Sequence, residues 1–192
     1  MGFDEEVIPA SELTTSLDAC AELCKARQHK PLLMLNPSAQ SVFPDSSSFK
    51  PDPQRSPKDL SSDEWEQLKS CDAVVVGLAP DLMRHEWLDE AFRLLSGEYG
   101  RKAQLIGTHR AMYLRPAADS SGNPSPLSLG PGAFLAALEA ASGCDPGQTV
   151  IVGKPQQEFF AQCLRQMGWD GQEPAEAWIV SDTYRTRGQI TS

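Results

Sequence analysis

The sequence predicts an α/β protein whose largely parallel sheet lies between helices. Two observations lead to this prediction: apolar runs of strand length alternate with helical apolar periodicity, and the run at residues 73–78 is continuously apolar. Alternating strands and helices produce parallel sheets, and a strand without polar alternation is typical of a sheet covered on both faces. A chain of 192 residues is long enough for one domain or one and a half.

The first elements are a helix and a strand. A helix is expected over residues 16–28, with Thr15 or Ser16 as its N-cap, and a buried strand over residues 31–36. The following segment, residues 37–63, holds five prolines and eight serines with few apolar residues. This composition predicts a long mobile insertion that contributes little to the core.

The middle of the chain continues the alternation. The 73–78 run is the second strand, and a helix with an apolar stripe follows it and ends near Gly97. Short strands are expected at residues 104–107 and 111–114. A second segment rich in proline, serine and glycine, residues 115–126, predicts another mobile loop.

The last third repeats the order of helix and strand. Helices are expected at residues 133–142 and 156–167, and strands at residues 149–152 and 177–180. We expect ligands outside the carboxyl ends of these strands, because open α/β sheets bind their ligands there.

Composition and charge exclude several classes of protein. The chain carries 17 Lys and Arg against 26 Asp and Glu, a formal net charge of -9, which argues against nucleic-acid binding because duplex recognition depends on clustered cations. An acidic start and the lack of any apolar stretch of about 20 residues predict a cytoplasmic protein without a membrane segment. Five cysteines without a C-x-x-C pair indicate buried free thiols.

Two polar residues follow strand-like segments near the end of the chain. Lys154 comes after Gly153, which follows the expected strand at residues 149–152. Asp182 follows the expected strand at residues 177–180. A fixed cation at a strand end stabilises phosphate charge, and a carboxylate there holds a hard cation such as Mg²⁺. Taken alone, a surface lysine and a turn or N-cap aspartate explain the same two residues.

Other motifs give weaker indications. Residues 147–155 fail as a Walker loop, because the spacing is too long and Pro155 replaces the required Ser or Thr. The three histidines show no metal-ligand spacing. A loose basic cluster is either a solvated face or a surface for an anionic substrate; it consists of Arg101, Lys102, His109, Arg110 and Arg115.

Four segments in combination resemble one family, although none is specific alone. They are Gly77–Pro80, Leu88–Leu95, Leu129–Phe134 and Val152–Pro155. In order and spacing they resemble the haloacid dehalogenase-like hydrolases, and within that superfamily the subgroup that includes phospholysine phosphohistidine inorganic pyrophosphate phosphatase. The likeness covers nearly the whole chain apart from the two loops.

The resemblance implies a large α/β cap domain over residues 1–127 and part of a Rossmann-like core over residues 128–192. Members hydrolyse phosphate esters or phosphoamides with Mg²⁺ and an aspartate nucleophile that becomes an aspartyl-phosphate. By the same likeness Lys154 is the catalytic core lysine and Asp182 the metal ligand. His109 and Gly153 are implied to bind the substrate, a phosphorylated small molecule or a phosphoprotein.

The sequence departs from the family pattern at its most reactive positions. The nucleophile motif Asp-x-Asp-Gly-Thr occurs nowhere in the chain. The last motif, usually Gly-Asp-Asp, is Ser181-Asp182-Thr183 here, and Arg185 and Arg187 place positive charge where a cation should bind. We therefore expect a family phosphatase that is truncated at both ends and inactive alone.

The missing nucleophile has two further consequences. The alternative prediction is a non-catalytic, degenerate relative that binds a ligand or a partner, because the altered motif around Asp182 suits binding without turnover. A parallel core that lacks its first strand also leaves unpaired edges and an uncovered apolar face, which predicts a homodimer or an aggregate.

Overall fold

The computed structural model describes residues 14–119 and 121–154 together with positions 156, 159, 160, 163, 164 and 168. A four-stranded parallel sheet runs through it in the order β1-β2-β3-β6. These strands span Pro31–Met34, Ala73–Val76, Gln104–Gly107 and Val150–Ile151. The predicted α/β fold with a parallel sheet is confirmed, and each of these strands lies within a segment expected to be a strand.

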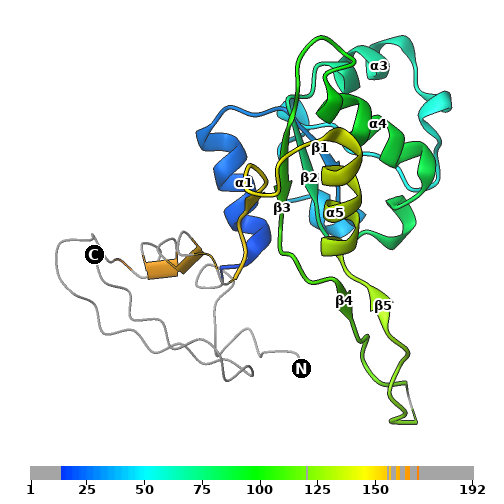
Figure 1. The fold of residues 1–192 in the computed structure, drawn as a ribbon, viewed down its shortest axis with the longest axis vertical. Coiled ribbons are helices and arrows are strands. Elements are labelled where there is room, and N and C mark those ends of the chain that lie inside the picture. The colour runs from blue at the N-terminus through cyan, green and yellow to red at the C-terminus, as the bar shows by residue number, and fades with distance from the viewer. Residues whose placement is uncertain are drawn as a thin grey trace.

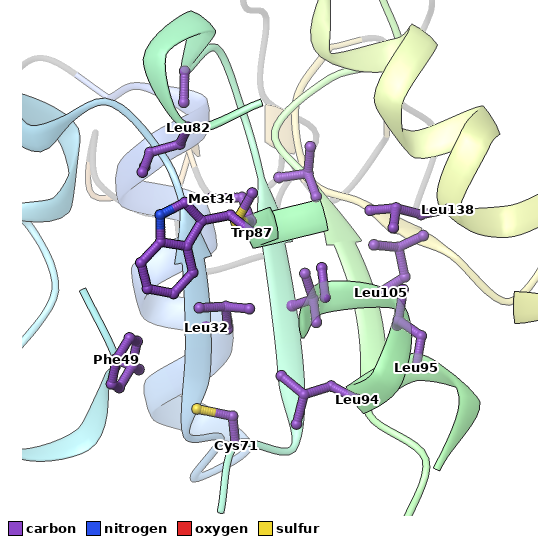
Figure 2. Packing of buried hydrophobic residues seen from close by; sticks show 14 of the residues in the cluster. Leu32, Met34, Phe49, Cys71, Leu82, Trp87, Leu94, Leu95, Leu105 and Leu138 are labelled. Carbon is purple, nitrogen blue, oxygen red and sulfur yellow. The ribbon is translucent and has the colours of Figure 1, made fainter. Parts of the chain in front are cut away.

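Helices cover both faces of the sheet (Figure 1). On one face, α4 (His85–Ser96) and α5 (Pro131–Ser142) pack against the side chains of alternate residues along the strands. Figure 2 shows the hydrophobic cluster that these side chains form with Trp87. On the other face, α1 (Ser16–Ala26) packs against the intervening positions. Side chains alternate across a strand, so a continuously apolar strand is buried on both faces. The first face holds Leu32, Met34, Val74, Val76 and Leu105, and the second holds Leu33, Leu35, Val75 and Ile106.

Local sequence signals set the bounds of the helices. Thr15 Oγ1 accepts a hydrogen bond from the Asp18 N–H while the Asp18 carboxylate accepts one from the Thr15 N–H, a capping box that begins α1 where predicted. α4 ends before Gly97, as predicted, and this residue has a left-handed φ of 81° that favours glycine. α5 begins at Pro131, whose missing N–H costs no helical hydrogen bond in the first turn.

Residues 37–63 are a folded part of the core. The segment forms three short helical turns, α2 (Pro37–Gln40), η2 (Asp45–Ser47) and η3 (Pro57–Asp59), and leads into α3 (Ser62–Lys69). Phe49 pairs with β1, because its N–H donates to the Pro31 carbonyl at 2.9 Å and its carbonyl accepts from the Leu33 N–H at 3.0 Å. Phe43 and Phe49 are both buried. The expectation that this segment adds little to the core is wrong, since two buried aromatic side chains anchor it.

A two-stranded antiparallel ribbon projects beyond the carboxyl end of β3 (Figure 1). It consists of β4 (Tyr113–Leu114), within a predicted strand, and β5 (Ser128–Leu129), where no strand was predicted. Two close backbone approaches hold its base. A Cβ at Gly130 would lie 2.2 Å from the Ala111 carbonyl oxygen, and one at Gly132 would lie 2.4 Å from that of Arg110. Only glycine fits at these two positions without a shift of the backbone.

Two elements that follow residue 127 pack with elements that precede it. β6 belongs to the same sheet as β1, β2 and β3, and α5 shares a hydrophobic cluster with α4. The division into a cap over residues 1–127 and a core over residues 128–192 remains a prediction. Only single positions of the predicted helix at 156–167 are described, and the predicted strand at 177–180 lies outside the described residues. In the described part of the chain, no helix has both the length and the apolar character to span a membrane.

Candidate functional site

The carboxyl edge of the parallel sheet is where the sequence places its candidate site. β3 and β6 are neighbours in the sheet, and Gly107 pairs with Ile151 at their ends. The pairing continues beyond the strands, because the Val152 N–H donates to the Gly107 carbonyl at 3.0 Å. The chain segments that leave these two strands therefore start side by side.

Three of the four predicted site residues lie in the segments that leave this edge: His109 follows β3, and Gly153 and Lys154 follow β6. Because β3 and β6 are neighbours in the sheet, these segments leave the same edge, where open sheets bind their ligands. Asp182 lies outside the described residues, so its predicted place beside Lys154 stays a prediction.

Gly153 is buried between two other segments. A Cβ at this position would lie 2.1 Å from the carbonyl oxygen of Thr108 and 3.1 Å from the Cβ of Ser16. The missing side chain therefore lets the end of β6 approach both the end of β3 and the first residue of α1. This close approach brings the backbone before Lys154 against the segment that carries His109.

His109 is half-buried, and burial lowers the pKa of its imidazole below the ordinary value of 6.5. Its Nδ1 lies 3.3 Å from the backbone nitrogen of Ala111 and accepts a hydrogen bond from that N–H. A neutral imidazole carries one proton, so Nδ1 as acceptor leaves the proton on Nε2. His109 can therefore donate a hydrogen bond from Nε2 to a ligand oxygen.

Lys154 is exposed at the end of β6. Within residues 14–119 and 121–154, the ion pairs of the structure do not include its ammonium group. An ammonium on a flexible four-carbon stem acts as a mobile point charge. Among the described residues no carboxylate competes with an anion for the Lys154 ammonium.

The basic residues between positions 101 and 115 do not form one anion-binding patch. Arg101 lies at the amino edge of the sheet and is 3.2 Å from the Asp72 carboxylate. Arg110 forms a two-pronged ion pair with buried Glu139, its guanidinium nitrogens 3.1 and 2.6 Å from the carboxylate oxygens. Both guanidinium groups are already neutralised by the protein. Of this set, His109 belongs to the candidate site.

The same edge presents Leu78, which the sequence analysis did not single out as a site residue. Leu78 comes two residues after the end of β2 and is 45% exposed. A Cβ at the preceding Gly77 would lie 2.6 Å from the Leu35 side chain, so close packing at this edge depends on a second glycine. Its place just after a parallel strand is the signal that could have identified it.

The described part of the chain holds no group of three or more His, Cys, Asp or Glu side chains placed to bind a metal ion. These residues therefore do not fit a magnesium site on their own. The predicted carboxylate ligand, Asp182, lies outside them. No step in the chemistry of the described edge is assigned to a metal.

Comparison with known proteins identifies relatives, although no family model matches the chain. The chain is 33% identical over 178 residues to haloacid dehalogenase-like hydrolase domain-containing protein 2 of Rattus norvegicus and of Homo sapiens, which covers 93% of this chain and 54% of each relative. It is 35% identical over 113 residues to phospholysine phosphohistidine inorganic pyrophosphate phosphatase of Danio rerio, covering 59% of this chain and 36% of that protein. The chain thus spans about half the length of the first two relatives.

Solved structures share the fold. The 4-nitrophenylphosphatase from Thermotoga maritima matches with a TM-score of 0.54 and 24% identity over 81% of this chain and 49% of that chain. A double mutant thermostable NPPase from Geobacillus stearothermophilus matches with a TM-score of 0.59 and 22% identity over 86% of this chain and 58% of that chain. At this identity the two likenesses establish the fold alone.

The parallel sheet between helices therefore defines an α/β fold that is also found in phosphatases. By sequence, the chain is similar to haloacid dehalogenase-like hydrolases over 93% of its own length. The predicted likeness to the subgroup that includes phospholysine phosphohistidine inorganic pyrophosphate phosphatase is confirmed.

Proposed function

We propose that the chain is the substrate-facing part of a magnesium-dependent phosphatase of the haloacid dehalogenase-like class. It binds phosphorylated ligands at the carboxyl edge of its sheet and does not hydrolyse them alone. In this proposal Lys154 holds the phosphoryl group, His109 donates a hydrogen bond to another oxygen of the substrate, and Gly153 keeps the two strand ends close. The ligand is a phosphorylated small molecule or a phosphoprotein, the classes that the family implies.

The observation that supports this proposal most is that β3 and β6 are neighbours in the sheet and that His109 and Lys154 follow their carboxyl ends. A phosphate ester presents charged oxygens, which attract an ammonium group, and a neutral bridging oxygen, which accepts a hydrogen bond. Charge-assisted hydrogen bonds are among the strongest that proteins make. An ammonium without an ion-pair partner among the described residues and an N–H donor, both after strand ends at one edge, suit both features of such a ligand.

The missing nucleophile motif favours binding without turnover. A covalent phosphatase needs a carboxylate that accepts the phosphoryl group, and Asp-x-Asp-Gly-Thr is absent from the sequence. In the family chemistry Mg²⁺ neutralises the phosphoryl oxygens when it is bound, and Asp182 would supply one of its oxygen ligands. In the alternative function, a degenerate relative, the same edge holds a ligand or partner and Asp182 holds no metal.

Calorimetric titration with inorganic phosphate tests the proposed site. We expect Lys154→Ala to weaken phosphate binding about tenfold, because one charge-assisted hydrogen bond is lost. Lys102→Ala is the matched control, since Lys102 is also exposed but precedes β3 at the opposite edge. If both variants lost phosphate affinity equally, the phosphate would be attracted nonspecifically by positive charge, which would contradict the proposed site.

Hydrolysis of 4-nitrophenyl phosphate separates the two candidate functions. We expect the purified chain to release no 4-nitrophenol above background, with or without Mg²⁺. Magnesium-dependent turnover that vanished in Lys154→Ala and Asp182→Asn would show that another group replaces the missing nucleophile. Absence of both turnover and phosphate binding would favour the partner-binding alternative.

A further inference from the structure

A cavity of about 340 Å³ lies between the last turns of α1, the start of β1 and the segment around η2. Cavities that hold small ligands measure roughly 300–1,000 Å³, so this one suits a molecule at the small end of that range. Lys30 and Pro31, which begin β1, line the cavity and place it at the amino edge of the sheet. A molecule bound there would not overlap the candidate phosphate site at the carboxyl edge.

The walls of this cavity are largely apolar. They include Ala21 and Cys24 of α1, Pro31 of β1, and Phe43 and Pro44 just before η2. Burial, followed by the nearby negative charge of Asp72, raises the pKa of the Cys24 thiol to about 11. Cys24 is therefore uncharged at neutral pH and adds apolar surface to the wall rather than a reactive thiolate.

The charged residues at the mouth of the cavity are all cations. Lys25 and Lys30 line it and are exposed, and the described residues that line it include no aspartate or glutamate. The Lys25 ammonium lies 3.8 Å from the Glu22 carboxylate, in an exposed pair of little energy. Within the described part of the chain, the ion pairs do not include the ammonium of Lys30. In a chain with a net charge of -9, this mouth favours an anion.

Gln28 lines the same cavity in a backbone conformation that favours glycine, with a φ of 55°. Its N–H donates to the Lys25 carbonyl at 3.1 Å, and the His29 N–H donates to the Cys24 carbonyl at 2.8 Å. This pair of hydrogen bonds is the Schellman motif, in which glycine usually occupies the position of Gln28. Residues held in such conformations cluster at ligand sites. Here the glutamine supplies a side-chain amide donor that glycine would lack.

We propose that this cavity binds a small monocarboxylic acid with an apolar body. The body packs against Phe43 and Pro44, and the carboxylate meets the ammonium of Lys30 and the side-chain amide of Gln28. Burial of the body supplies most of the affinity, and the charge-assisted contact with Lys30 selects an anion over a cation. This site does not depend on the proposed phosphatase function, because none of its residues belongs to the carboxyl edge.

Calorimetric titration of the full chain with octanoate tests the proposal. We expect saturable binding at one site per chain, unchanged by an excess of inorganic phosphate. Octylammonium has the same apolar chain with the opposite charge, and it should bind roughly tenfold more weakly or worse. Lys30→Ala should weaken octanoate binding about tenfold, because one charge-assisted hydrogen bond is lost. Lys58→Ala is the matched control, since Lys58 is an exposed lysine of η3 away from the cavity, and it should leave the affinity unchanged.

Two further variants separate loss of binding from loss of folding. Ala21→Phe should abolish octanoate binding, because the larger side chain fills the cavity. Gln28→Gly should raise the urea midpoint, because glycine adopts the left-handed φ without steric cost, yet lower octanoate affinity about fivefold, because one hydrogen bond is lost. A folding defect would lower both quantities together. The absence of saturable octanoate binding, equal affinity for octylammonium, or wild-type affinity in Lys30→Ala and Gln28→Gly would overturn the proposal.

Discussion

At the amino edge of the parallel sheet charged side chains pair with one another, whereas at the carboxyl edge the candidate site groups lack such partners in the described part of the chain. The Asp72 carboxylate accepts a hydrogen bond from the Lys30 N–H at 2.7 Å. It also lies 3.2 Å from His29 Nδ1 and 3.2 Å from a guanidinium nitrogen of Arg101. This carboxylate therefore joins three segments that enter the sheet.

This comparison indicates that the charged groups around Asp72 at the amino edge stabilise the fold, whereas those at the carboxyl edge are available to bind a ligand. The Asp72 backbone reinforces the amino edge, because its N–H donates to the Lys30 carbonyl at 3.0 Å and its carbonyl accepts from the Gln104 N–H at 2.9 Å. The carboxyl edge instead leaves the half-buried imidazole of His109 and the exposed ammonium of Lys154 for a ligand. Changes at the first edge should lower stability, and changes at the second should lower binding.

The largest effect is expected from Asp72→Ala. This variant removes the acceptor for the Lys30 N–H and the partner of Arg101, so the free energy of unfolding should fall by about 2–3 kcal/mol. Urea denaturation measures the change, and Asp81→Ala, an exposed acid, is the control with little expected effect. A cost no larger than that of the control would mean that the amino edge is not a structural clamp.

Gly153→Ala should affect both stability and binding. The added Cβ must move away from the Thr108 carbonyl oxygen, which we expect to cost about 1–3 kcal/mol of stability. The same shift separates the segments carrying His109 and Lys154, so phosphate affinity should fall as well. Gly147→Ala is the control, because the nearest atom to its added Cβ would be a side-chain oxygen of Asp145 at 3.3 Å rather than a backbone atom. Wild-type phosphate affinity in Gly153→Ala would show that the close approach does not shape the site.

Lys154→Ala should show the opposite pattern to Asp72→Ala. Because Lys154 is exposed and the ion pairs of the described residues do not include it, its replacement should change the free energy of unfolding by less than about 0.5 kcal/mol. Phosphate affinity should nevertheless fall. Denaturation and calorimetry on one preparation measure both quantities, and a large loss of stability would assign Lys154 to the structure rather than to the site.

The smallest effect concerns the protonation of His109. Its pKa is lowered by burial, so its NMR titration midpoint should lie below the ordinary value of 6.5. As the pH falls from 6.5 toward the lower pKa of the folded chain, the unfolded chain binds more protons at this imidazole than the folded chain does. The free energy of unfolding therefore decreases as the pH falls. His109→Gln should remove part of that decrease. A midpoint above 6.5 would mean that the imidazole is paired with a negative charge.

The helices and strands were predictable where their signals are local. The cap of α1, the glycine at position 97 and the continuous apolar run at residues 73–78 all depend on neighbours in the sequence. β5 and the pairing of Phe49 with β1 depend on contacts between distant residues, so no local pattern indicated them. α3 did have a local signal, the capping box of Ser61 with Glu64, within a stretch whose prolines predicted a loop.

The sequence suggested candidate site residues but not their arrangement. The position of Lys154 shortly after an apolar strand suggested it, and the family likeness suggested His109; the roles of both residues remain predictions. Their adjacency requires β6 to pair with β3, although the ribbon and α5 separate these strands in the chain. The neutralisation of Arg110 by Glu139 likewise depends on the packing of α5 against the sheet, which no spacing in the sequence encodes.

Mapping phosphate-induced chemical shift changes on the isotope-labelled chain tests the central claim most directly, because it compares the two edges in one experiment. The account predicts that backbone amide signals of Thr108, His109, Gly153 and Lys154 move in a saturable way, while those of Asp72 and Arg101 stay in place. Signals that move at the amino edge, or no saturable change at the ends of β3 and β6, would contradict it.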